Sequence, residues 1–425
     1  MKSKIKKLGG TARQFEIKLS SEKVNGILKE VLEDIRKEAK VPGFRPGKAP
    51  LDIVQKKYEK DALDEVKRRL IPEAYQQALD EHDIAPVTYP EISDISIDSA
   101  GALVFKAKVD VYPEIKLRKY KGLKATKEKA SVKDEEVEEA LTRIRNINAE
   151  FTEKDSPIGK GDFGICDVEA FVDGKSISTR HRNMWIEANK ESSLLGLGEE
   201  LCGLKKGDTK DIDVTLPENY PDKKYAGKAA TFNIEVKDVR EKKLPDLDDD
   251  LAKKLQKKDM NEVRDSLHAQ IMERKAYNNK VNMKNQIMEQ LLKAHSFDVP
   301  ESMVKRQLDV LIEKAQNELA QKGVDKERIE SEKDKLRQQM QGDAENKVRL
   351  YFILDKIANE ENIIVEDDET DEWLKSLAQS YGQPFENVKK YYEEKDLIGG
   401  LKEQLREEKT LDFLLSEAVI TEKNK

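Results

Sequence analysis

The ten residues 41–50, VPGFRPGKAP, carry the side chains best suited to a specific chemistry in this sequence. An aromatic residue, Phe44, is followed closely by the cations Arg45 and Lys48, and the glycines and prolines around them restrict or redirect the backbone. An aromatic ring on a stiff loop can bury apolar area in a partner while the cations meet an anionic surface. A plain connector between helices accounts for the glycines and prolines, but not for Phe44. The stretch therefore predicts a binding loop.

The same stretch lacks the spacing of a phosphate-binding nucleotide loop. Such a loop follows a strand, keeps four residues between its glycines and has Ser or Thr after its lysine. Here three residues separate Gly43 from Gly47, a helical pattern precedes the loop, and Ala49 follows Lys48. No other segment has the pattern. We therefore expect a protein that acts without ATP.

Metal and redox chemistry have few candidate residues. These are Cys166, Cys202, His82, His181, His268 and His295. The two cysteines do not have the spacing of a disulfide framework or a metal knuckle, and a lone histidine is more often a surface or half-buried residue than a ligand. We predict no metal site, no cofactor and no histidine-based catalysis.

The charge of the chain is unevenly distributed. The 425 residues carry a net charge of -7, yet residues 1–50 hold 13 Lys and Arg against 6 Asp and Glu, which gives this segment +7 and leaves -14 for the rest. A basic front on an acidic body indicates that only the front meets an anionic partner. No stretch approaches the roughly 18 apolar residues of a membrane span, and no apolar core follows the basic start as in a secretory signal. We expect a cytoplasmic protein without a membrane partner.

The loop is expected to lie in a small α+β domain at residues 1–112. RQFEIKLS alternates apolar and polar residues as a half-buried strand does. A helix with one apolar face follows, with Val24, Ile27, Leu28, Val31, Leu32 and Ile35 at helical spacing. A second helix is predicted over 51–81, and the period-two runs DISIDS and LVFKAKVDVYP predict a hairpin with its turn at 99–101.

The predicted secondary structure of the rest of the chain changes twice. Residues 113–150 read as a helical linker that packs with the C-terminal domain, and 151–243 as a compact β-rich insert with many glycines and short alternating runs. Residues 244–425 are almost entirely helical in pattern. The predicted fold class is therefore α+β and multidomain, with an elongated all-α C-terminal domain.

GFRPGKAP resembles, position by position, the Gly-Phe-Arg-x-Gly-Lys-x-Pro signature of the trigger factor family, the bacterial ribosome-associated chaperones. The resemblance extends over the whole chain. In that family the loop docks on ribosomal protein and RNA beside the exit of the nascent-chain tunnel. The resemblance implies contacts from Phe44, Arg45 and Lys48, with the loop shaped by Gly43, Pro46, Gly47 and Pro50.

The resemblance also implies how the domains divide the work. The front would bind the ribosome, the insert would be an FKBP-like prolyl isomerase domain, and the C-terminal domain with two arms would form an apolar-patched cradle. Its partners would be nascent and unfolded polypeptides, and the free protein would tend to form a homodimer. The protein would be cytoplasmic and partly ribosome-associated.

An FKBP-type pocket works by shape, because an X–Pro bond isomerises when its twisted amide is held in an apolar, aromatic-walled site. The resemblance maps that pocket here onto Asp167, Val168, Ile177, Trp185, Leu195, Leu197, Tyr220 and Phe232. Aliphatic residues stand where the family has aromatic ones at Val168 and Ile177, and leucines replace its aromatic pocket floor. We therefore expect weak or absent isomerase activity.

Two other functions remain open at this point. The first is a free multidomain prolyl isomerase that acts on unfolded proteins, although the loop at 43–50 and the depleted pocket argue against it as the main role. The second is an RNA-binding protein that uses the basic front. Aromatic residues are only 6% of the chain, and the front has no array of aromatics between its cations.

Overall fold

The computed structural model describes residues 1–38, 42, 44–45, 47–177, 180–189, 196–217, 220, 224–322, 324 and 326–423. The chain forms two compact units. The first unit contains Met1–Thr126 and Met283–Thr421, and the second contains Lys127–Asn282 and Glu422–Lys425. About half of the chain is helical, with a β-rich middle region and a helical C-terminal part, as the fold class predicted.

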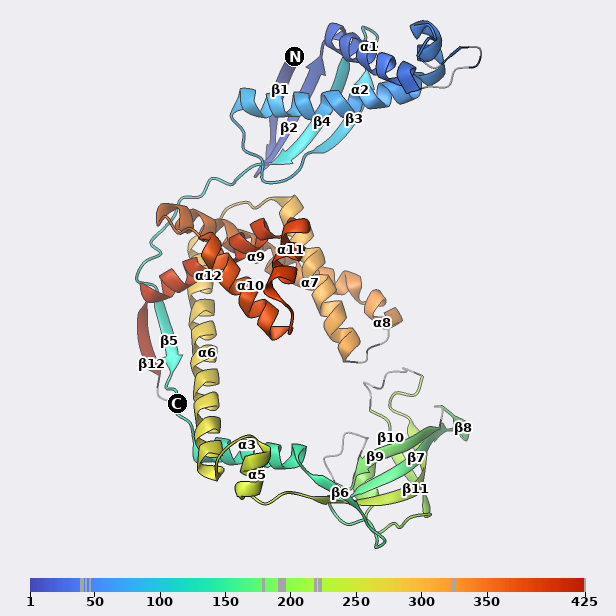
Figure 1. Ribbon diagram of the computed structural model, residues 1–425, viewed down its shortest axis with the longest axis vertical. Coiled ribbons are helices and arrows are strands. Elements are labelled where there is room, and N and C mark those ends of the chain that lie inside the picture. Colours follow the sequence, from blue (N-terminus) through green and yellow to red (C-terminus); the bar gives the residue numbers. More distant parts are fainter. Residues whose placement is uncertain are drawn as a thin grey trace. The chain divides into compact units, whose positions relative to one another are not determined.

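The first unit begins with an α/β layer. Its elements are β1 (Lys2–Gly9), β2 (Ala12–Leu19), α1 (Ser21–Glu38), α2 (Leu51–His82), β3 (Glu91–Ile97) and β4 (Leu103–Asp110). The strands form one antiparallel sheet in the order β1-β2-β4-β3, and Figure 1 shows α1 and α2 packed across it with β1 at one edge. The predicted β3–β4 hairpin is confirmed, with Asp98 N donating to Ala102 O at 2.9 Å across its turn.

Alternation in the strands decides which face of this sheet is covered. Phe15, Ile17 and Phe105 are fully buried, and the residues between them in β2 point to the opposite face. The covered face packs against α1 and α2, whose contributions to the core include Val31 and Val66. Neither α1 nor α2 covers the other face of the sheet (Figure 1).

The remainder of the first unit is a helical body. Its elements are the C-terminal part of α6 (Met260–Ala294), α7 (Glu301–Gln321), α8 (Lys326–Ser331), α9 (Lys333–Glu360), α10 (Asp367–Ser380), α11 (Phe385–Glu394) and α12 (Ile398–Ser416). Two clusters hold it together: α6, α9 and α12 meet around Ile353 and Leu414, and α7 meets α9 around Leu308 and Phe352.

The second unit contains the insert. Its elements are α3 (Asp134–Ile147), β6 (Glu150–Glu153), β7 (Phe163–Val172), β8 (Lys175–Ser176), β9 (His181–Glu187), α4 (Leu197–Glu200), β10 (Thr209–Thr215), β11 (Ala229–Lys243) and α5 (Asp249–Lys254). The two long strands β7 and β11 pair antiparallel in the middle of a six-stranded sheet, with β6 and β10 on β11 and β8 and β9 on β7.

Three strands were not predicted. β1 has only Ile5 and Leu8 as apolar residues, so an edge strand held mainly by backbone hydrogen bonds gives no alternating signal. β5 (Lys124–Glu128) and β12 (Val419–Lys423) pair with each other although they lie far apart in the sequence, and the boundary between the two units falls within both. β12 is exposed at every residue, so burial leaves no pattern in its sequence.

The linker at 113–150 is helical over α3 but not over its first part, where the prediction is wrong. Up to Thr126 this segment belongs to the first unit, and from Lys127 onward it belongs to the second. The first part follows the helical body in an extended form, because backbone N–H groups find partners there: Arg118 N donates to His295 Nε2 at 2.9 Å, and Thr126 N donates to Gln286 Oε1 at 2.8 Å. The division into four domains stays a prediction.

Candidate functional site

The loop between α1 and α2 is fixed at its C-terminal side. Lys48 N donates to Arg45 O at 3.0 Å, which closes a four-residue turn, and Gly47 has a φ of +81°, a value that L side chains rarely adopt. Gly47 N in turn donates to Arg36 O at 3.1 Å in the last part of α1. Ala49 is 3% exposed and joins the core of the layer, and Pro50 precedes the first turn of α2.

The side chains of the motif point away from this anchored backbone. Phe44 is 41% exposed, and Arg45 and Lys48 are exposed as well. Among the described residues, neither cation has an ion-pair partner. Gly43 and Pro46 of the motif lie outside the described residues. The described part of the loop thus presents an aromatic ring and two free cations on a backbone that is held by hydrogen bonds and by one buried alanine.

The residues assigned to the isomerase pocket are distributed differently. Val168, Leu197 and Phe232 are buried at 4%, 0% and 7% exposure in the core of the insert, and Ile177 and Tyr220 are half-buried against it. Leu195 lies outside the described residues. The structure therefore brings these five side chains together, as parts or neighbours of one hydrophobic core.

Asp167 lies beside this core and is 7% exposed. Its carboxylate accepts a hydrogen bond from Asn183 N at 3.0 Å and lies 3.4 Å from the guanidinium of Arg180. Arg180 also pairs with Glu235, and the hydrogen bond from Lys237 is the first cause that holds the pKa of Glu235 below its ordinary value. The carboxylates of Asp167 and Glu235 therefore both lie within ion-pair distance of the Arg180 guanidinium.

Trp185 is not brought together with the other pocket residues. It stands opposite Ile165 in the β7–β9 pair and is 51% exposed. Its ring packs on Phe151 and Phe163, with centroids 5.3 and 6.0 Å away. Its neighbour Ile186, at 2% exposure, faces the core instead, so Trp185 points to the other side of the sheet. The sequence pattern alone did not assign a face to this residue.

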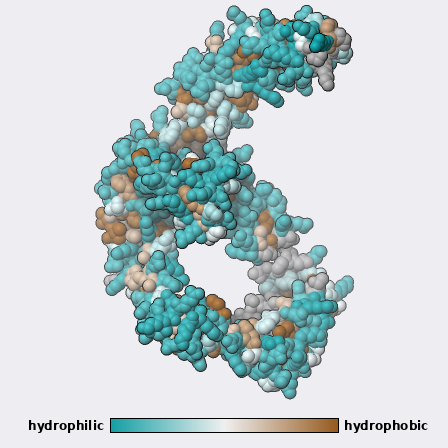
Figure 2. Space-filling model, viewed as in Figure 1, coloured by the Kyte–Doolittle hydropathy of each residue, from teal (hydrophilic) through white to brown (hydrophobic). Residues whose placement is uncertain are grey.

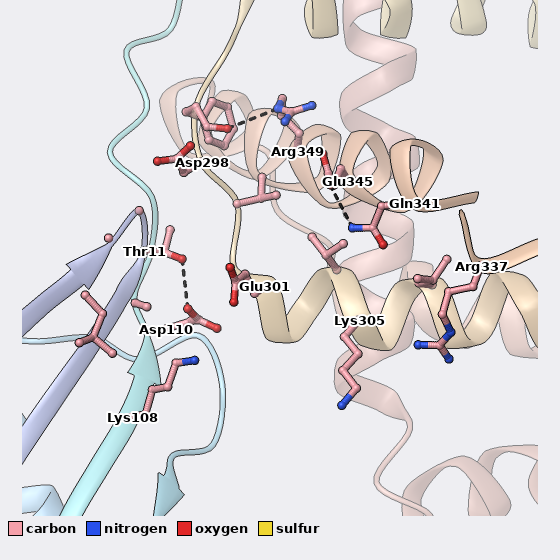
Figure 3. Close-up of a pocket in the computed structure, with 18 residues that line it drawn as sticks. Thr11, Lys108, Asp110, Asp298, Glu301, Lys305, Arg337, Gln341, Glu345 and Arg349 are labelled. Atoms are coloured by element: carbon pink, nitrogen blue, oxygen red, sulfur yellow. Dashed lines mark hydrogen bonds between the residues drawn. The ribbon is translucent and has the colours of Figure 1, made fainter. Parts of the chain in front are cut away.

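A cavity of about 800 Å³ in the first unit was not foreseen from the sequence. Figure 3 shows that its lining comes from the β1–β2 turn, from the end of β4 and from α7 and α9. Thr11 donates to Asp110 at 3.1 Å at one side, and Ser302 donates to the same carboxylate. Gly10 approaches Asp298 so closely that a Cβ would lie 3.1 Å from its side chain. Four separate chain segments build this cavity, so no local motif announces it.

The charges around the cavity are mixed. Its cations are Lys108, Lys305, Arg337 and Arg349, and its carboxylates are Asp110, Asp298, Glu301 and Glu345. Apolar residues such as Val304 and Leu308 lie between them.

Among the described residues, no group of three or more His, Cys, Asp and Glu side chains is arranged to hold a metal ion. No helix formed by these residues is long and apolar enough to cross a membrane.

Comparison with known proteins gives a consistent answer. The family model described as "Bacterial trigger factor protein (TF)" matches residues 1–144, and that described as "Bacterial trigger factor protein (TF) C-terminus" matches residues 259–416. The trigger factor of Geobacillus kaustophilus is 34% identical over 99% of this chain and 100% of its own length. That of Halalkalibacterium halodurans is 32% identical over 98% of each.

A solved structure titled "Promiscuous Substrate Recognition in Folding and Assembly Activities of the Trigger Factor Chaperone" covers 98% of this chain and 100% of that one at 21% identity. Its TM-score of 0.49 carries no argument about the fold. The matches to curated trigger factors at 32–34% identity, over nearly the full length of both chains, identify the family of this protein. The chain belongs to the trigger factor family of chaperones.

Proposed function

We propose that this protein is an ATP-independent chaperone of the cytoplasm that docks on the ribosome beside the tunnel exit and shields emerging polypeptides. The observation that carries the proposal is the described tip of the 42–50 loop, where Phe44 is 41% exposed and is followed by Arg45 and Lys48, two cations without ion-pair partners among the described residues. Fully burying a phenylalanine side chain in a partner contributes about 1.5–3 kcal/mol. Arg45 and Lys48 add attraction to an anionic surface such as ribosomal RNA.

The anchored backbone supports this role. Binding is weakened when a loop must first be ordered, and each immobilised side chain costs about 0.5–1.5 kcal/mol. Here the hydrogen bond from Gly47 N to Arg36 O and the burial of Ala49 hold the base of the loop before any partner arrives. Gly43, Phe44, Arg45, Pro46, Gly47, Lys48 and Pro50 remain the proposed ribosome-binding residues.

The helical body is the proposed surface for clients. Most of its large apolar residues are buried, as Phe352 and Ile353 are at 0% exposure. A few stand out: Val310, Ile364, Tyr381, Tyr391 and Leu397 are 41–74% exposed. Figure 2 shows small apolar patches separated by hydrophilic surface on the visible face. Small separate patches bind unfolded segments weakly and release them quickly, so a client leaves when it buries its own apolar surface.

Co-sedimentation with ribosomes tests the docking proposal. The variant Phe44→Ala/Arg45→Ala/Lys48→Ala should lose binding to purified ribosomes by at least about tenfold, because each truncated group is a potential anchor of the contact. A matched control removes the same kinds of residue from the helical body, as Tyr381→Ala/Arg306→Ala/Lys314→Ala, and should bind as the natural chain does. If the loop variant is folded and still co-sediments fully, the loop is not the docking site.

We infer further that the insert has weak or absent prolyl isomerase activity. The support is that Val168, Leu197 and Phe232 are packed in the hydrophobic core and that aliphatic residues replace aromatic ones at two pocket positions. A protease-coupled assay on a proline tetrapeptide should give a rate close to the uncatalysed isomerisation, which takes roughly 10–100 s at 25 °C. A rate like that of an active FKBP enzyme in the same assay would reject this inference.

A further inference from the structure

The open face of the N-terminal sheet carries a row of lysines along its edge. In the β1–β2 pair, Ile5 stands opposite the buried Phe15, so Ile5 faces the helices. Lys2, Lys4 and Lys6 alternate with Ile5 and therefore point to the other face, which no helix of the layer covers. All three are exposed.

These lysines lie in an environment of like charge. Alternate residues of a strand are roughly 6.8 Å apart, so each lysine has a cationic neighbour along the row. Across the strand, Lys2 stands opposite Lys18, and directly opposed like charges destabilise a sheet. The row is an arrangement that a bound anion would stabilise.

The nearby carboxylates form no ion pair with the lysines of the row. Asp98 pairs with Lys18 at 2.7 Å, and Asp94 pairs with Lys106 at 2.8 Å. Glu16 stands opposite Lys4, but no ion pair within 4.0 Å joins them. Within the described part of the chain, none of Lys2, Lys4 and Lys6 has an ion-pair partner.

The chemistry of this face favours a phosphate backbone over a polypeptide. The row's neighbours in β2 are Gln14, Glu16 and Lys18, so the face beside it offers no apolar pocket for side chains of a peptide. Regularly spaced point charges without aromatic residues are suited to repeated phosphates, read through charge and not through bases.

We propose that Lys2, Lys4 and Lys6 form a second ribosome contact, which binds phosphates of RNA. This inference rests on the proposed docking function but not on the loop residues that serve it. The loop joins α1 and α2, whose side chains cover the inner face of the sheet, whereas the lysine row lies on the outer face. The two contacts would therefore involve different RNA or protein surfaces.

The test measures ribosome affinity of the whole protein at 50–200 mM salt. Each phosphate contact contributes about 0.7–0.9 to the slope of log affinity against log salt. Lys2→Gln/Lys4→Gln/Lys6→Gln should therefore make that slope shallower by about 2–3. The ratio of the natural chain's affinity to the variant's affinity should then fall roughly 20-fold or more as the salt rises from 50 to 200 mM. The charge-retaining variant Lys2→Arg/Lys4→Arg/Lys6→Arg should keep the natural slope.

A matched control removes three exposed lysines of the helical body, as Lys314→Gln/Lys322→Gln/Lys335→Gln, and equalises the change in net charge. Circular dichroism checks that every variant is folded. If the glutamine row variant has the same slope as this control, or if the arginine variant also loses affinity, the proposal is overturned. Lysines on an edge strand can also serve only to prevent edge-to-edge pairing, in which case the row variant would aggregate with its slope unchanged.

Two further measurements identify the partner and separate this inference from the docking loop. A labelled 20-nucleotide oligouridine should bind the natural chain at low salt and lose affinity in the glutamine row variant. If polyglutamate shows that loss and the RNA does not, the partner is an acidic polypeptide and the RNA assignment is wrong. If the loop variant binds ribosomes fully while the row variant does not, the loop proposal fails and the lysine row stands.

Discussion

Phe44 of the proposed docking loop and Phe232 of the proposed isomerase pocket are the same residue type, yet the first is 41% exposed and the second 7% exposed. Phe44 stands on a turn, beside cations without ion-pair partners among the described residues. Phe232 stands in the central strand β11 of the insert, opposite Ala170 of β7, and belongs to the hydrophobic core. One motif places its side chain in solvent and the other places it in a core.

This difference shows what a motif can and cannot indicate. A residue contributes to binding only as far as a partner can reach it, and an aromatic residue that already fills a core contributes mainly to stability. In the proposed docking loop, Phe44, Arg45 and Lys48 are all exposed and so accessible to a partner. In the insert, most described residues of the proposed pocket belong to the core or pack against it, which is in line with the proposal of weak isomerase activity.

The comparison is sharpest when the two phenylalanines are truncated in turn. Phe232→Ala should destabilise the insert by about 3–5 kcal/mol, because it leaves a cavity in a packed core. Phe44→Ala should change the stability of the N-terminal layer by less than about 0.5 kcal/mol. Urea unfolding followed by Trp185 fluorescence in a Trp373→Phe background reports on the insert, and hydrogen exchange of β2 and β4 reports on the layer. A loss of protection in β2 and β4 on Phe44→Ala would contradict the comparison.

The two cysteines test how closed the core of the insert is. Burial, with a smaller effect of the adjacent Asp167, raises the pKa of the Cys166 thiol to about 12. At pH 8 its thiolate is therefore scarce, and Cys166 should react with iodoacetamide on the order of a thousandfold more slowly than an ordinary exposed thiol. Cys202 is exposed and serves as the internal reference, read by mass spectrometry of the two peptides. Equal labelling of both residues would mean that the core opens readily.

The charge cluster beside Asp167 gives the smallest effect. Lys237 and Arg180 lower the pKa of Glu235 in the folded insert, so the stability that Glu235 contributes is present above its ordinary pKa of 4.5 and is lost as the pH falls through the lower folded value. The Glu235→Gln variant should therefore be slightly less stable than the natural chain at pH 7 and equal to it near pH 2. Trp185 fluorescence, again in the Trp373→Phe background, measures the urea concentration at which half of the insert is unfolded. A difference that persists at pH 2 would assign the effect to packing.

Sequence patterns identified the elements that have a buried face. The stripe through Val24, Val31 and Leu32 and the alternation in β4 both follow from contact with one core, and both were predicted correctly. β1, β5 and β12 were missed, because edge strands and strands whose partners lie far away in the sequence have no local period to reveal them. The lysine row was missed with β1, since its shared face exists only once the strand does.

The candidate loop could be identified from residue types, but its exposure could not. Sequence alone did not show that Ala49 would be buried while Phe44 is not, because that depends on where α1 ends and α2 begins. The face of Trp185 was equally hidden, since it is set by the register of β9 on β7, which shifts between Cys166 and Val168. The cavity beside Asp110 draws on segments spread through the sequence from Leu8 to Arg349, which no local pattern connects.

The hydrogen bond from Gly47 N to Arg36 O has a kinetic consequence. Since the base of the tip is shaped when the layer folds, attachment and departure in the proposed function need no rearrangement there. Exchange between bound and free molecules would then be governed by collision frequency and by the strength of the contacts at the tip. One molecule of this protein would then bind many ribosomes in succession, and no chemical step such as nucleotide hydrolysis would be needed between one binding event and the next.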